Sequence, residues 1–107
     1  MHFPRLVFGP EHDERSKIEM TSRGYASHVF AETASGRYYS VFFYDPFRLR
    51  QDLESGAEYG TPFLAEPGMI VVPEVTKEAM EIAIKGLHKE GYFDYLQPIL
   101  SPQGMSE

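Results

Sequence analysis

The chain has 107 residues and no cysteine, and these two facts limit both its size class and its chemistry. A chain of this length forms one domain with a single hydrophobic core. The lack of cysteine excludes disulfide bonds, a thiol nucleophile and cysteine zinc ligands, so nothing in the sequence requires an oxidising compartment. We expect residues 1–100 to form a single α+β domain and residues 101–107 to be a flexible C-terminal tail.

The net charge of −6 is concentrated in the second half of the chain. Residues 1–50 hold seven basic and six acidic side chains, a net of +1, whereas residues 51–107 hold three and ten, a net of −7. Such an acidic surface repels nucleic-acid phosphates and either serves solubility alone or attracts a basic protein. The N-terminal apolar run is broken too early for a signal peptide, and no apolar stretch has membrane-spanning length. We therefore expect a cytoplasmic protein with neither a nucleic-acid nor a membrane partner.

Runs of β-branched and aromatic residues predict a mostly antiparallel sheet of four to five strands. The clearest signal is Ala34-Ser35-Gly36, which lies between two such runs as a hairpin loop does. Side chains on both faces of the second run are apolar, so each face is expected to be covered, the second by a loop, a terminal segment or a partner chain. The strands are expected at residues 3–8, 16–21, 25–33, 37–44 and 69–73. The stretch 16–21 alternates apolar and charged residues, although a helical turn is also compatible with it.

Two main helices are expected to pack on this sheet, at residues 46–55 and 76–90. Asp45-Pro46 is a favourable start for the first helix, with Leu49 and Leu53 on its buried side. Thr76 is the expected N-cap of the second helix. Its apolar stripe consists of Met80, Ala83, Ile84 and Leu87.

Catalytic motifs with the required spacing are missing from the sequence. The four histidines do not form a ligand pair of helical or strand spacing, and no phosphate-binding loop or nucleophile elbow occurs. Carboxylate pairs are too abundant to indicate a glycosidase site in so small a domain. We therefore expect no catalytic residue, no metal site and no cofactor, and a protein that is not an enzyme.

Two segments give the chain its resemblance to a known class of proteins. They are Phe42-Phe-Tyr-Asp-Pro-Phe-Arg-Leu-Arg-Gln-Asp-Leu53 and Glu66-Pro-Gly-Met-Ile-Val-Val-Pro-Glu-Val75, set in a small, cysteine-free, acidic α+β chain. In this general profile the chain resembles the immunity proteins of bacterial polymorphic-toxin and contact-dependent inhibition systems. The resemblance implies a non-catalytic inhibitor that blocks a cognate toxin, and it assigns no individual residue a role.

The charge distribution places the expected contact surface in the acidic half. We expect a basic, nuclease-like partner to be steered by opposite charge and held by an aromatic anchor. The expected partner-binding residues are Asp52, Glu54, Glu58, Tyr59, Phe63, Glu66 and Glu74. The alternative is a self-associating, dimeric α+β domain that binds a small molecule or has a regulatory role, with the two-faced aromatic strand at its dimer contact.

Overall fold

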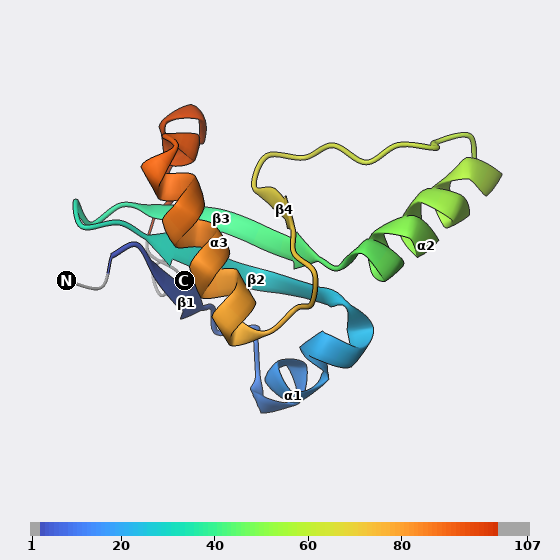
Figure 1. Ribbon diagram of the computed structural model, residues 1–107, viewed down its shortest axis with the longest axis horizontal. Helices are drawn as coiled ribbons and strands as arrows, with labels where there is room; N and C mark the ends of the chain where they lie inside the picture. Colours follow the sequence, from blue (N-terminus) through green and yellow to red (C-terminus); the bar gives the residue numbers. More distant parts are fainter. Residues whose placement is uncertain (1–2, 101–107) are drawn as a thin grey trace.

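The computed structural model describes residues 3–100 and shows an α+β fold (Figure 1). Its core is a four-stranded, mixed but mostly antiparallel sheet accompanied by three α-helices. In chain order the elements are β1 (Arg5–Phe8), α1 (Glu14–Arg23), β2 (Tyr25–Glu32), β3 (Tyr38–Tyr44), α2 (Pro46–Glu58), β4 (Met69–Val71), α3 (Lys77–Lys89) and the short 3-10 helix η1 (Tyr92–Tyr95). The tail predicted at 101–107 lies outside the described residues.

The sheet follows the chain in the order β1-β2-β3-β4. The first two pairings are antiparallel, and the predicted hairpin between β2 and β3 is confirmed. Its turn is closed by the Thr33 amide, which donates to the Arg37 carbonyl at 2.9 Å, and Gly36 takes the positive φ of 84°. β4 runs parallel to β3, because α2 and the loop after it carry the chain back beside the last residues of β3, where Met69 pairs with Phe42.

The strand predicted at 16–21 is wrong, because this stretch lies inside α1. The Asp13 side chain caps the helix by accepting from the Ser16 amide at 2.8 Å, and Gly24 ends it at φ 69°. Within the helix, Glu19 forms ion pairs with Arg15 and Arg23, each four residues away. Six residues of alternating polarity fit both a strand and a helix, and here the caps and the ion pairs favour the helix.

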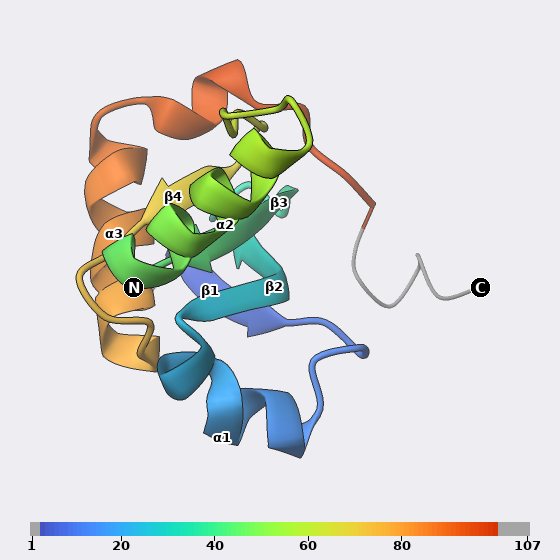
Figure 2. The ribbon, with the colours of Figure 1, turned by 90° about the vertical axis from the view of Figure 1, so that its right-hand side faces the viewer.

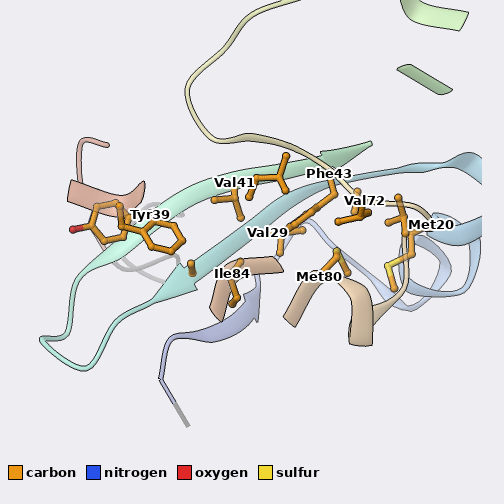
Figure 3. Close-up of a cluster of buried hydrophobic side chains, with 13 residues drawn as sticks. Met20, Val29, Tyr39, Val41, Phe43, Val72, Met80 and Ile84 are labelled. Atoms are coloured by element: carbon orange, nitrogen blue, oxygen red, sulfur yellow. The ribbon is translucent and has the colours of Figure 1, made fainter. Parts of the chain in front are cut away.

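The hydrophobic core lies between one face of the sheet and α3 (Figure 3). Val29, Val41 and Phe43 from the sheet are almost fully buried, as are Met80 and Ile84 from the helix. The helix begins as predicted, because the Thr76 hydroxyl accepts from the Ala79 amide at 3.1 Å. The predicted apolar stripe of α3 is confirmed, with Ala83 and Leu87 partly buried beside the core.

α2 does not cover the sheet as predicted. None of residues 46–58, all of which the structure describes, is buried, and Leu49 and Leu53 are only half-buried. The helix continues to Glu58, past the predicted end at residue 55. It projects beyond the end of β3, with a long loop leading back to β4 (Figure 1, Figure 2). A helix that connects parallel strands ordinarily packs on the sheet. α2 differs from this arrangement, and most of its surface is accessible.

Candidate protein-binding surface

α2 is fixed to the rest of the fold at its first turn. Asp45 is the N-cap, and its side chain accepts from the Arg48 amide at 2.7 Å. The Asp45 amide donates to the Gly24 carbonyl at 2.9 Å, which joins the start of α2 to the end of α1. A Cβ atom on Gly24 would lie 2.5 Å from the Asp45 carboxylate, so this junction requires glycine both for space and for its positive φ.

Asp52 contacts residues where α2 joins the sheet, so it is not part of an open acidic surface. The Arg48 guanidinium lies 5.3 Å from the Tyr25 ring centroid and donates to Asp52 at 3.1 Å. Tyr25 and Tyr44 pack with their ring centroids 4.9 Å apart. Burial raises the pKa of Tyr44 to about 12, and the neighbouring Asp52 carboxylate acts in the same direction. The Asp52 carboxylate is therefore occupied in holding α2 against the end of the sheet.

The outward face of α2 carries an aromatic ring at one end and carboxylates at the other. Helical spacing of four, seven and eleven residues places Gln51, Glu54 and Glu58 in line with Phe47, opposite the half-buried leucines. Phe47 is 70 % exposed, and Glu54 and Glu58 are exposed as well. Glu54 pairs with Arg50 at 3.3 Å, but both groups remain in water, where such a pair is weak.

The tip of α2 presents two further aromatic rings on an ordered turn. Tyr59 is 82 % exposed and Phe63 is 66 % exposed. The turn beneath them is closed because the Thr61 amide and hydroxyl both donate to the Gly56 carbonyl, at 2.8 and 3.1 Å. A side chain on Gly56 would collide with the Thr61 carbonyl, so the close return of the chain depends on this glycine. An ordered turn reduces the entropy lost when the rings are buried by a partner.

The structure brings together some of the predicted site residues and separates others. Glu54, Glu58, Tyr59 and Phe63 lie together on the distal part of α2 and its exit, and the exposed Glu66 follows on the same loop. The exposed Glu74 lies in the turn between β4 and α3, which both views place apart from the tip (Figure 1, Figure 2). We call Phe47, Glu54, Glu58, Tyr59, Phe63 and Glu66 the arm surface.

The arm surface is acidic because no lysine or arginine occurs between Arg50 and Lys77. Residues 51–76 contain five carboxylates and neither lysine nor arginine. Phe47 is not among the partner-binding residues predicted from the sequence, because that prediction used Leu49 and Leu53 to define the apolar side of the helix. Its helical phase, in line with Glu54 and Glu58, is the signal that identifies it.

Buried His12 is a separate feature of the loop that leads into α1. Its side chain is 6 % exposed, it stacks on Phe8 with ring centroids 4.5 Å apart, and its Nδ1 lies 3.1 Å from the Ser27 carbonyl oxygen. Its Nε2 has no hydrogen-bond partner within residues 3–100. Burial lowers the pKa of His12 from its ordinary value of 6.5, and nearby Lys17 and His28 act in the same direction. The carbonyl of Ser27 and the carboxylate of Asp13 oppose this shift.

Acid should therefore destabilise the fold through His12. The unfolded chain binds a proton at this residue before the folded chain does, so stability is complete above about pH 6.5 and falls as the pH drops through the lower, folded-state pKa. Urea unfolding measured between neutral and mildly acidic pH should show this loss in the native chain and less of it in His12→Gln. The exposed His28 provides the control, and an equal loss of pH dependence in His28→Gln would contradict the assignment.

Comparison with known proteins identifies no family: no family model matches the chain, and no curated protein or solved structure is significantly similar to it. Among residues 3–100 no group of three histidine or acidic side chains is arranged to hold a metal ion. None of the helices in the same range combines the length and the apolar character needed to cross a membrane. Among the described residues, the arm surface combines exposed aromatic rings with exposed carboxylates.

Proposed function

We propose that the protein is a non-catalytic binding domain, of the immunity or antitoxin type, that acts in the cytoplasm and neutralises a basic, nuclease-like toxin through its arm surface. The observation that carries this proposal is α2, which leaves the sheet, buries none of its residues and exposes an aromatic ring and carboxylates on one face. Exposed aromatic side chains are the residue type that most often anchors a protein contact. The resemblance in composition to immunity proteins supports the same class.

The arm surface supports two separable steps of binding. The exposed carboxylates of the arm surface, Glu54, Glu58 and Glu66, would attract a basic cleft over a long range and speed the encounter. The exposed rings of Tyr59 and Phe63 would then be buried in the cleft and supply most of the affinity. Because the helix and its turn are already ordered, they would enter the cleft without refolding and block access of the toxin to its substrate.

A second candidate, a self-associating domain, is favoured by the sheet face that points away from the core. Phe42 pairs with Met69 and Tyr44 with Val71 across β3 and β4. On this face Phe42 and Met69 are only half-buried and Val71 is exposed. A homodimer could cover these side chains, and such a dimer would be the alternative to an acidic inhibitor.

The test is to mix the purified chain with the protein encoded by the neighbouring gene and to measure sedimentation of each component and of the mixture. We expect a monomer when the chain is alone and a one-to-one complex in the mixture, with loss of the partner's toxic activity. A tight symmetric dimer of the chain alone, with no complex in the mixture, would favour the second candidate and overturn the first.

Charge reversal checks the steering step within the same complex. Glu54→Lys combined with Glu58→Lys should slow association by about tenfold at low salt, and the difference should shrink as salt is added. The matched control is Glu81→Lys combined with Glu90→Lys, which changes the net charge equally on α3 and its C-cap. Equal slowing by both pairs would show a general charge effect and would contradict steering by the arm surface.

A further inference from the structure

Two adjoining depressions flank His88 on the side of the molecule away from α2. The first, of about 330 Å³, lies between the β2–β3 turn and η1, and its lining includes Thr33, Ser35, Phe93 and Asp94. The second, of about 250 Å³, is lined by Lys85, Lys89 and Phe3. His88 lines both, so the two depressions adjoin at this residue. Figure 1 shows the β2–β3 turn and η1 at the opposite end of the sheet from α2.

The first depression is rich in groups that bind hydroxyls. The Thr33 side chain is 7 % exposed, and its Oγ1 lies 2.9 Å from the Ser35 Oγ. The Asp94 carboxylate stands at the rim beside Gly91, where a Cβ atom would lie 3.2 Å from Asp94 Oδ2. Gly91, at φ 80°, adopts a conformation that favours glycine, and a side chain there would press on the Asp94 carboxylate. Because the buried Thr33 hydroxyl also donates to the Arg37 carbonyl at 3.4 Å, the groups offered to the vicinal hydroxyls of a polyol are the Ser35 hydroxyl and the Asp94 carboxylate.

The second depression is cationic within the acidic half of the chain. Lys85 and Lys89 are four residues apart on α3, so their ammonium groups lie on one face and repel each other. Within residues 3–100 neither lysine forms an ion pair. The dipole of α3 favours cations near its C-terminus, but it does not account for the polar hollow beside them. An anion between the two lysines would relieve their repulsion.

We propose that these two depressions form one binding site for a small phosphorylated polyol such as a sugar phosphate. The phosphate lies between Lys85 and Lys89, next to His88, and the hydroxyls of the polyol reach Asp94 and Ser35. The arrangement matches the chemistry of the ligand, because the charged group and the hydroxyl-bearing part meet lysines and oxygen atoms respectively. The site is independent of the arm surface and of the function proposed for it.

The test is an amide chemical-shift titration of the full chain with ribose 5-phosphate, inorganic phosphate and ribose as separate probes. Ribose 5-phosphate should shift amides near both depressions with a dissociation constant on the order of 1 mM or tighter. Inorganic phosphate should act only near Lys85 and Lys89 and should bind more weakly, and ribose should bind weakest.

Matched variants separate the two halves of the site. Lys85→Ala or Lys89→Ala should weaken ribose 5-phosphate binding by about tenfold, whereas Lys77→Ala, at the other end of α3, should leave it unchanged. Asp94→Ala should reduce the affinity for ribose 5-phosphate toward that for inorganic phosphate. The proposal is overturned if no localised shifts appear, if Lys77→Ala weakens binding equally, or if phosphate binds as tightly as the sugar phosphate.

Discussion

Replacing Ile84 with alanine should lower the free energy of unfolding by about 2–5 kcal/mol, whereas the same truncation at Leu53 should cost about 1 kcal/mol or less. Both residues are aliphatic side chains of similar size on a helix. Ile84 is fully buried against the sheet, and Leu53 is half-buried on a helix without a buried residue. The pair therefore compares the two helices that the sequence predicts to cover the sheet.

Urea unfolding of the two variants beside the native chain makes this comparison. The unfolding slope should stay the same, because neither truncation changes the surface exposed on unfolding by much. A loss of 2–5 kcal/mol is a large part of the stability of a small domain, so Ile84→Ala should be partly unfolded at physiological temperature. If Leu53→Ala were as destabilising as Ile84→Ala, α2 would have to pack on the core, and this would contradict the exposed position of the helix.

Local sequence signals predicted those elements whose local and tertiary preferences agree. The turn at Gly36 and the cap at Thr76 each need one residue type at one position, so the hairpin and α3 could be identified from the chain alone. α1 could not, because the stretch around Ile18 and Met20 is short enough to fit either period. Its identity depends on Asp13 and Gly24, which lie outside the stretch that was predicted as a strand.

The position of α2 shows a different limit. Leu49 and Leu53 predict an amphipathic helix, and a helix forms there, but its apolar side is only half-buried. Periodicity indicates which side of a helix is apolar, and it does not indicate whether the connecting chain lets that side reach the sheet. The core face of the sheet is already covered by α3, through Met80 and Ile84.

The candidate site was predictable in its charge and not in its geometry. The excess of acid in residues 51–76 is a property of composition and could be read directly. The role of Asp52 could be predicted only in part. Helical spacing predicts its pairing with Arg48, but the packing of Arg48 on Tyr25 and the approach of Tyr44 depend on the folded chain. Among the predicted acidic residues, the fold therefore assigns one to anchoring the arm and leaves Glu54, Glu58 and Glu66 exposed on the arm surface.

Replacing both Tyr59 and Phe63 with alanine should weaken binding of the proposed basic toxin by at least about thirtyfold, or about 2 kcal/mol. Both rings are mostly exposed, so their removal should leave the free energy of unfolding within about 0.5 kcal/mol of its native value. The loss should arise mainly from faster dissociation, because the rings act after the encounter.

Association and dissociation rates, measured by surface plasmon resonance, distinguish this anchoring step from steering. Glu54→Lys with Glu58→Lys should act on association and depend on salt, whereas Tyr59→Ala with Phe63→Ala should act on dissociation at every salt concentration. Tyr95→Ala is the matched control, because Tyr95 is 88 % exposed on η1 and far from α2 in sequence. If Tyr95→Ala weakened binding equally, or the double truncation left dissociation unchanged, the tip of α2 would not be the anchor. The toxin would then have to be held by another surface, with the carboxylates of α2 contributing only to the rate of encounter.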